Sequence, residues 1–315
     1  MKDYFKFNLT GIKLLPVWIL FLVLFMVPYF FLIFKLKDIQ TGNPMTSLFI
    51  FPVFLVLICV ALVISFFIQK LCIEGIEYKD KSLIFNGKLG EFIGIILLGG
   101  LLSVITLGIY SPWFIKNIQK FFINNSSYDS NNPEFEGTGG SLFVILTLTL
   151  ILPIIIISIF QGLFMISHPN VFSTLYSVLY QIFVLIILIP YIYFVYKWSV
   201  DIKFKDYTIN WETNFWQSSG KILTQICLSI ITIGIYYPLA TLKLYKYFAE
   251  RTYARSESNA KTFGYDIEPL DDFLFIWGQT LLTIITLGIY YPWAFCKVRS
   301  RILSKTYLEE IEVAE

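Results

Sequence analysis

Charge is scarce in this 315-residue chain: only 15% of its residues are Asp, Glu, Lys or Arg, against about 25% in soluble domains. Hydrophobic residues make up 57%, which leaves too little polar surface to cover a water-soluble globule. Three stretches, 14–34, 39–69 and 137–196, contain no charged residue at all. A membrane-spanning helix needs about 20 apolar residues. The composition therefore excludes an ordinary soluble domain and predicts a polytopic membrane protein.

Residue types that carry most enzyme chemistry are also few. The single histidine, His168, falls in a loop between two apolar segments, and the four cysteines form no C-x-x-C pair. No zinc-protease, phosphate-loop or nucleophile–histidine–acid pattern occurs. We therefore predict no enzyme activity, no catalytic or metal-binding residue and no cofactor. The formal net charge of +2 does not indicate a nucleic-acid partner.

The strongest apolar segments contain no carboxylate, the group whose presence would indicate an ion or proton pathway. Four of them are predicted to be plain spans: 14–34, 48–68, 142–166 and 174–196. The first is read as a retained helix because no small-residue cleavage site follows it. Glu91, Asp271 and Asp272 lie at the entrances of other apolar segments, where we expect solvated carboxylates.

An eight-residue motif occurs three times. It reads T-L-G-I-Y-S-P-W at 106–113, T-I-G-I-Y-Y-P-L at 232–239 and T-L-G-I-Y-Y-P-W at 286–293. The first two copies lie 126 residues apart, and the preceding apolar segments keep nearly the same offset. Such internal repetition predicts tandem units.

The predicted units are 1–125, 126–255 and a partial third, 256–315. Each full unit has two long apolar helices, then a polar linker, an apolar segment that ends in the motif, and a basic helix. The linkers alternate in the manner of short strands, as in 202–205 and 207–211. The expected fold class is nevertheless all-α, with small strand-like linkers between helical units.

The motif is predicted to bend the chain at the membrane interface. Glycine weakens a helix, and proline suits the first turn of a new one. Tyrosine and tryptophan settle at the level of the lipid headgroups. The residues with this expected structural role are Gly108, Tyr110, Pro112, Trp113, Gly234, Tyr236, Pro238, Gly288, Tyr290, Pro292 and Trp293.

The helix after each motif has an apolar face and a basic face, which suits a helix lying on anionic lipid. The alternative is a solvated charged face on an ordinary packed helix. The cations expected to contact lipid headgroups are Lys116, Lys120, Lys243, Lys246, Lys297, Arg301 and Lys305.

Two topologies fit these segments. If the motif segments enter and return, the protein has four spans and three re-entrant or interfacial segments, and every basic stretch faces the cytoplasm together with both termini. If they cross, it has seven spans and the basic linkers are split between the two sides. Because Lys and Arg concentrate on cytoplasmic loops, we favour four spans.

The repeated motif, with degenerate Phe-Gly segments before it and basic helices after it, resembles the YjgN-like family. The resemblance covers roughly 83–307, and the second copy departs from it at Leu239, where tryptophan is expected. It implies a bacterial inner-membrane protein of unknown function and supplies no catalytic residues.

Three functions remain open on this evidence. The first is a non-enzymatic protein that organises the membrane or binds lipids or partner proteins, with the bilayer and its anionic lipids as the expected partner. The second is a small-solute transporter or channel, which duplicated and re-entrant segments also fit. The third, an enzyme acting on lipid, lacks the clustered carboxylates or nucleophile–base pair that it would need.

Overall fold

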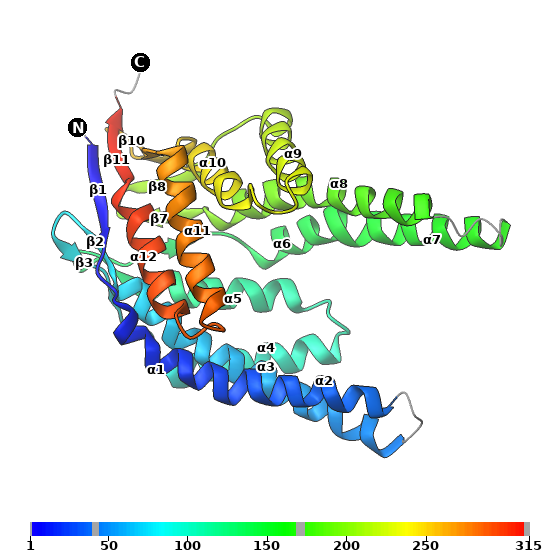
Figure 1. Ribbon diagram of the computed structural model, residues 1–315. Coiled ribbons are helices and arrows are strands. Elements are labelled where there is room, and N and C mark those ends of the chain that lie inside the picture. Colours follow the sequence, from blue (N-terminus) through cyan, green and yellow to red (C-terminus); the bar gives the residue numbers. More distant parts are fainter. Residues whose placement is uncertain (1, 40–43, 168–173, 312–315) are drawn as a thin grey trace.

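The structure, a computed structural model, describes residues 2–39, 44–167 and 174–311. Strands gather at one end of the molecule together with both chain termini, and two pairs of long helices extend away from them (Figure 1). Shorter helices pack beside these pairs. His168 and its turn lie outside the described residues.

The two helix pairs are built alike. The first consists of α1 (Gly11–Phe21), a π-helical turn (Leu22–Met26), α2 (Val27–Ile39) and α3 (Pro44–Glu74). The second consists of α6 (Gly139–Leu146), a π-helical turn (Thr147–Ile151), α7 (Leu152–Ser167) and α8 (Thr174–Ser199). The π-helical turns occupy matching places in the two pairs, which agrees with a duplication.

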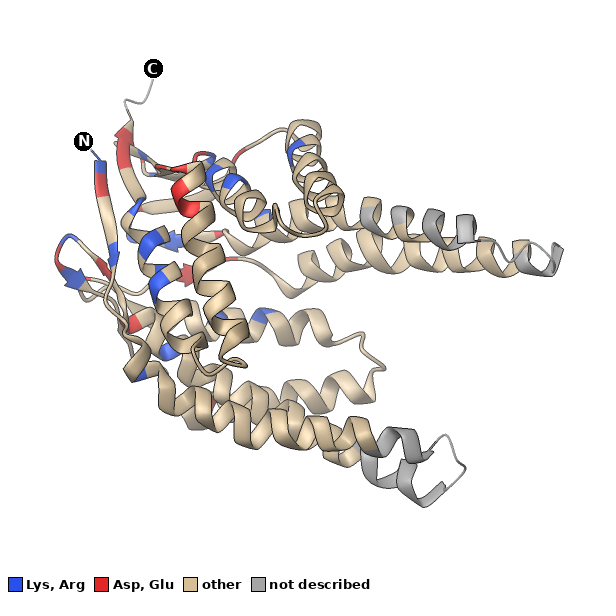
Figure 2. Cartoon of the chain, in the orientation of Figure 1, with Lys and Arg blue, Asp and Glu red and all other residues tan. Residues whose placement is uncertain are grey.

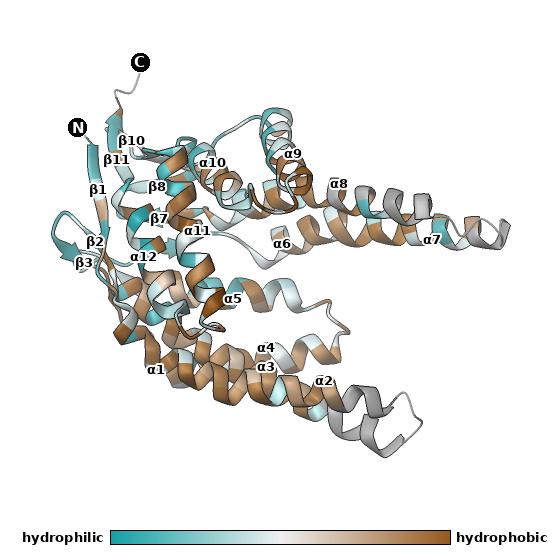
Figure 3. Cartoon of the chain, in the orientation of Figure 1, coloured by the Kyte–Doolittle hydropathy of each residue, from teal (hydrophilic) through white to brown (hydrophobic). Residues whose placement is uncertain are grey.

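Three stretches in the described part of the chain are long and apolar enough to cross a membrane: Gly11–Phe34, Pro52–Glu74 and Gly139–Phe164. They coincide with three of the four predicted spans. The fourth, 174–196, lies in α8, where several side chains fall outside the described residues. The long helices are strongly apolar, and the strands at their base are polar (Figure 3).

Each motif joins two shorter helices into a hairpin. The three hairpins are α4 (Leu89–Ile105) with α5 (Ser111–Asn124), α9 (Phe215–Ile231) with α10 (Tyr237–Ala249), and α11 (Pro269–Ile285) with α12 (Tyr291–Ser304). The helices run antiparallel, since in the first hairpin Phe92 meets Phe121 and Gly99 meets Phe114. The first helix of each hairpin has 17 residues, or about 25 Å, which is short for a 30 Å hydrocarbon core.

The polar linkers assemble into a nine-stranded sheet in the order β3-β2-β1-β11-β10-β9-β8-β7-β6. Its strands are β1 (Lys2–Phe7), β2 (Ile76–Tyr78), β3 (Lys81–Ser82), β6 (Glu134–Phe135), β7 (Ile202–Phe204), β8 (Tyr207–Trp211), β9 (Thr252–Arg255), β10 (Ala260–Tyr265) and β11 (Thr306–Ile311). A separate pair joins β4 (Ile84–Phe85) to β5 (Ser126–Ser127). The expected all-α class is therefore wrong, because linkers from every predicted unit pair with one another.

Pairing between distant linkers determines the architecture. N-terminal β1 lies between β2 and C-terminal β11, with all pairs antiparallel. The first and the partial third predicted units are thus joined edge to edge. Every helix pair and every hairpin consequently leaves the sheet and returns to it. Charged side chains concentrate at the sheet, whereas the described parts of the long helices carry almost none (Figure 2).

Candidate functional site

The motif forms a tight reversal at the tip of each hairpin. In the first copy, Leu107 and Gly108 have positive φ angles of 51° and 90°, a conformation that glycine adopts at no steric cost. The Thr106 hydroxyl accepts a hydrogen bond from the Tyr110 backbone N–H at 3.0 Å, and Pro112 lies in the first turn of α5. The same bonds and angles recur at Thr232, Ile233, Gly234 and Tyr236, and at Thr286, Leu287, Gly288 and Tyr290.

The tips present apolar side chains to the surroundings. The residue before each motif glycine is almost fully exposed: Leu107 at 93%, Ile233 at 92% and Leu287 at 91%. A second apolar residue follows each glycine, and all three of these are also exposed (Ile109, Ile235 and Ile289). Ile233 adopts its positive φ although β-branched residues rarely do. Three separate tips of this kind are suited to contact with lipid.

Trp side chains on neighbouring helices satisfy carbonyls at two of the tips. Trp18 of α1 donates its indole N–H to the Gly288 carbonyl at 3.0 Å. Trp277 of α11 donates to the Ile235 carbonyl at 2.9 Å. In lipid an unpaired backbone carbonyl costs several kcal/mol, so such partners allow an irregular turn to enter an apolar medium.

A buried ion cluster fixes the base of the third hairpin. Asp272 is 1% exposed, and one of its carboxylate oxygens lies 2.6 Å from both Arg301 Nε and Lys305 Nζ. Its other oxygen accepts from the Glu268 backbone N–H at 2.9 Å and from the Tyr265 hydroxyl at 3.4 Å. The expectation that Asp272 is solvated is wrong, because its cationic partners come from the other helix of the hairpin.

The positions equivalent to Asp272 and Arg301 make other kinds of contact in the other two hairpins. In the second, Ser218 is fully buried and hydrogen-bonds the Tyr247 hydroxyl at 3.0 Å. In the first, the rings of Phe92 and Phe121 lie 5.3 Å apart. The same place in the repeat therefore joins the two helices by an ion pair, a hydrogen bond or an aromatic contact. Of these, only the ion cluster can restrain the cations of the basic helix.

The motif tryptophans pack against glycines that begin two of the long helices: Trp113 against Gly139 of α6, and Trp293 against Gly11 of α1. A Cβ at Gly11 would lie 2.6 Å from the Trp293 ring and 2.8 Å from its Cα, and a Cβ at Gly139 would overlap the Trp113 ring. The second motif has Leu239 instead, and the chain after it proceeds through strands to α11 without a long apolar pair. Leu239, which replaces the tryptophan of the family pattern, thus packs against no described glycine at the start of a long helix. We call the contact of Trp113 with Gly139, and that of Trp293 with Gly11, a glycine socket.

The seven cations expected to contact lipid occupy different environments. Arg301 and Lys305 belong to the ion cluster, so their charge is already paired. Lys297 donates to the Tyr290 hydroxyl at 2.9 Å, and its equivalent Lys243 lies 5.4 Å from the Tyr236 ring centroid. Lys120 is exposed, whereas Lys116 and Lys246 are half-buried, the latter 3.5 Å from Glu250. Contact of these residues with lipid stays a prediction.

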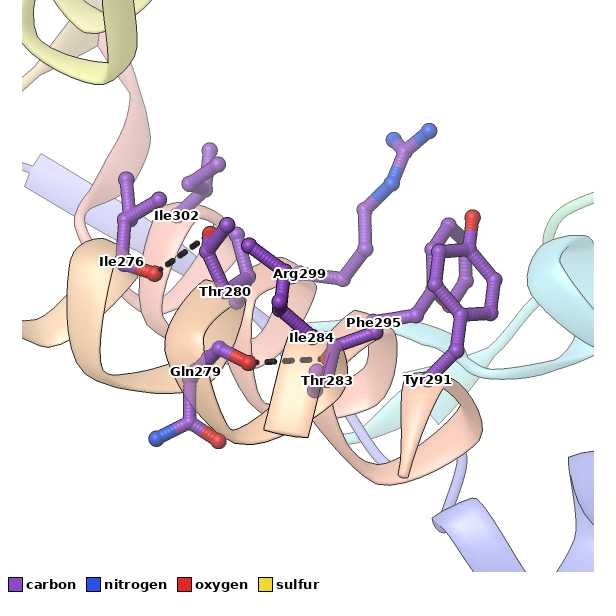
Figure 4. Close-up of a pocket in the computed structure, with 11 residues that line it drawn as sticks. Ile276, Gln279, Thr280, Thr283, Ile284, Tyr291, Phe295, Arg299 and Ile302 are labelled. Atoms are coloured by element: carbon purple, nitrogen blue, oxygen red, sulfur yellow. Dashed lines mark hydrogen bonds between the residues drawn. The ribbon is translucent and has the colours of Figure 1, made fainter. Parts of the chain in front are cut away.

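A groove of about 410 Å³ runs between α11 and α12 (Figure 4). Its walls are mainly apolar, and Tyr291 and Phe295 lie at one side beside exposed Arg299. Among the described residues Arg299 forms no ion pair with a carboxylate, and its guanidinium carbon lies 5.4 Å from the centroid of the Phe295 ring. Reasoning from the repeat missed Arg299, because Gln119 and Tyr245 hold the equivalent positions. Within the described ranges, no group of three His, Cys, Asp or Glu residues could hold a metal ion.

Comparison with known proteins bears on the family but not on an activity. The chain is 32% identical to the inner membrane protein YjgN of Salmonella typhimurium (strain LT2) over 110 residues, which are 35% of this chain and 27% of that protein. This chain therefore matches much less than two thirds of its relative. No solved structure matches.

A family model described as a bacterial protein of unknown function, DUF898, matches residues 1–266. The match reaches the N-terminus, further than the motif alone implied, and stops before the third copy of the motif. The membership inferred from the YjgN-like pattern is confirmed: the chain belongs to the DUF898 family of bacterial membrane proteins of unknown function.

Proposed function

We propose that this protein is a non-enzymatic, multi-pass protein of the bacterial inner membrane that binds and orders the lipids of one leaflet. The observation that carries the proposal is the trio of hairpin tips, each with two exposed apolar residues beside a motif glycine. In water such tips would be unfavourable, since burial of apolar surface contributes about 25 cal/mol per Å². In a lipid leaflet the same side chains are surrounded by acyl chains, which stabilises insertion of the tips.

The sheet supports four spans with three re-entrant hairpins. All linkers pair within one antiparallel sheet, and a hydrogen-bonded sheet cannot be divided by a bilayer. Both helices of each hairpin must then enter from the sheet side and return to it. The excess of Lys and Arg in the N-terminal segment and the linkers favours the cytoplasm for that side, and with it for both termini.

The groove of Figure 4 offers a place for one phospholipid chain. Its apolar walls match an acyl chain, and Arg299 stands at its side as a cation with no carboxylate partner among the described residues, which suits it to a phosphate. Exposed Lys120, Lys243 and Lys297 would add attraction for anionic headgroups along the second helix of each hairpin, at about 1 kcal/mol for each cation near the surface.

The transporter reading has less support. A solute pathway would bring the motif glycines together around a lined channel. A Cβ at Gly108, Gly234 or Gly288 would meet no described atom within 4 Å, so these glycines lie in open space at separate tips. Solute flux from liposomes that is abolished by a bulky substitution at Gly234 would reverse this preference.

Hairpin insertion has a direct test. In a chain whose four cysteines are replaced by serine, an environment-sensitive fluorophore on a single cysteine at 107, 233 or 287 is expected to be quenched by brominated lipids. Labels on exposed Ser130 and Glu310 at the sheet should be quenched by a water-soluble agent added to one side. Tip labels that respond only to the aqueous agent would contradict insertion, and opposite-side labelling of 130 and 310 would contradict four spans.

Lipid binding has a separate test at Arg299. Arg299→Ala is expected to reduce severalfold the anionic phospholipid that remains bound when the protein is extracted in native lipid discs, because the phosphate loses a charge-assisted hydrogen bond worth about 1.5–3 kcal/mol. Lys203→Ala is the control, since Lys203 is an exposed cation on β7 far from the groove. Equal lipid content in the two variants would overturn the assignment.

A further inference from the structure

The sheet borders an open cavity that lies apart from the hairpin tips. The cavity has a volume of about 520 Å³, within the range of roughly 300–1,000 Å³ typical of sites for small organic molecules. Its walls come from β1, β2 and β7 to β11, closed by the segment after α5. On β7 and β8 the residues that line it alternate with exposed ones, so one face of the sheet points inward.

The turn that follows β5 joins the two ends of the curled sheet. The Tyr128 hydroxyl donates to the Tyr78 carbonyl of β2 at 3.0 Å. Asp129 lies 2.6 Å from Lys81 of β3 and 3.7 Å from Lys205 between β7 and β8. Strands at opposite ends of the sheet order are thus held around a common interior.

Aromatic rings form a continuous arc along the inside. Phe5 stacks on Tyr78 at 4.8 Å and lies 6.4 Å from Phe263. Tyr78 in turn lies 5.8 Å from Tyr128, which lies 6.4 Å from Phe204. The arc is wide and apolar, and among the residues that line the cavity only Ile123, near the end of α5, belongs to a helix. A solvent-facing sheet interior with this much aromatic surface indicates an apolar ligand.

The cavity is also lined by three cations and by no carboxylate: Lys79, Lys205 and Lys261. They lie near the strand ends furthest from the helices. Asp3, Asp129 and Glu310 pair with them at 2.8, 3.7 and 3.3 Å but line no part of the cavity. Burial raises the pKa of Tyr78 to about 12, and its hydroxyl donates to the Asp3 carboxylate at 3.4 Å.

We propose that this cavity binds a single-chain amphiphile with an anionic head, of the fatty-acid class. The chain would lie along the aromatic arc, where removing its methylene groups from water favours binding. The carboxylate would reach the three lysines. This inference goes beyond the proposed leaflet function and does not depend on it, because no residue of the cavity belongs to a hairpin tip or to the groove of α11 and α12.

Photolabelling with a diazirine derivative of palmitate tests the inference on the full-length protein in phosphatidylcholine nanodiscs. Mapped adducts are expected in 76–85, 202–211 and 260–265, and unlabelled palmitate should compete for them. Lys205→Glu and Lys261→Glu should each weaken this competition about tenfold, since an attraction between the lysine and the carboxylate is replaced by a repulsion between two carboxylates.

Lys203→Glu is the matched control, because Lys203 lies on the same strand pair but points outward. Its competition curve should match that of the unsubstituted protein, and all three variants should keep their thermal denaturation midpoint. Lys205 lies in an exposed turn, so its variant tests the site even if Lys261→Glu unfolds. Adducts confined to the long helices, equal effects of Lys203→Glu and Lys205→Glu, or equal competition by neutral monopalmitoylglycerol would overturn the proposal. The hairpin-depth and Arg299 results would be unaffected.

Discussion

Replacing Asp272 with serine is expected to lower the free energy of unfolding by about 3–5 kcal/mol, the cost of breaking a buried ion pair. The substitution removes the buried carboxylate that Arg301 and Lys305 both contact at 2.6 Å, and leaves them only the exposed Glu268 carboxylate, at 3.7 and 2.9 Å. It also removes the acceptor for the Glu268 backbone N–H. Thermal denaturation in nanodiscs, followed by tryptophan fluorescence, measures the loss.

Asp271→Ser provides the control for that experiment. Asp271 precedes Asp272 in the first turn of α11 but is exposed, so its loss should change the denaturation midpoint little. A midpoint for Asp272→Ser as high as that of Asp271→Ser would refute a stabilising role for the ion cluster.

The second hairpin supplies a way to restore the stability. Ser218, Tyr247 and Arg251 occupy the positions of Asp272, Arg301 and Lys305, and the Arg251 guanidinium lies 3.8 Å from the Tyr247 ring centroid. Combining Asp272→Ser with R301Y and K305R is therefore expected to recover most of the lost stability. The triple variant would replace the ion cluster with the hydrogen bond and the cation–π contact that hold the second hairpin together. Failure of the triple variant to exceed Asp272→Ser would show that the three hairpin bases are not interchangeable.

Adding one methyl group at Gly139 is expected to destabilise the protein by about 1–3 kcal/mol, as overpacking does elsewhere. A Cβ there would lie 2.7 Å from Trp113 Cγ and 2.9 Å from its Nε1, closer than side chains pack. Neither the ring nor the start of α6 can shift easily, because Thr138 caps this helix by accepting from the Ser141 N–H at 3.1 Å. The same denaturation assay applies.

The next residue offers a matched comparison. A Cβ at Gly140 would meet nothing within 4 Å, so Gly140→Ala should be neutral or stabilising by up to about 1 kcal/mol through its helix propensity. Trp113→Leu, which copies the second motif at Leu239, should relieve part of the penalty of Gly139→Ala. Equal denaturation midpoints for Gly139→Ala and Gly140→Ala would show that close contact between Gly139 and Trp113 is not needed for stability.

Local patterns in the sequence were enough to predict several features. Charge-free runs predicted the long helices, since burial in lipid forbids charge over about 20 residues. The repeated motif predicted a break between two helices at 106–113, because Thr, Gly and Pro act on the backbone within one turn. The same motif predicted the family. These features depend on neighbours in the chain, which a sequence displays directly.

Other features depended on contacts between distant residues. The linkers looked like isolated short strands, and nothing in their alternation shows that β1 pairs with β11 or that the sheet curls around a cavity. Asp272 looked solvated until Arg301, on the returning helix, was brought within reach.

The sequence by itself determined that the chain enters a membrane, that its units repeat and where each hairpin turns, because hydropathy and turn chemistry act over a few residues. Only the tertiary structure decided that every linker contributes a strand to one sheet, which of the basic side chains are already paired, and that Arg299 stands beside an apolar groove with no carboxylate partner in the described part of the chain. Strand pairing, burial and ion pairing are set by which distant segments meet.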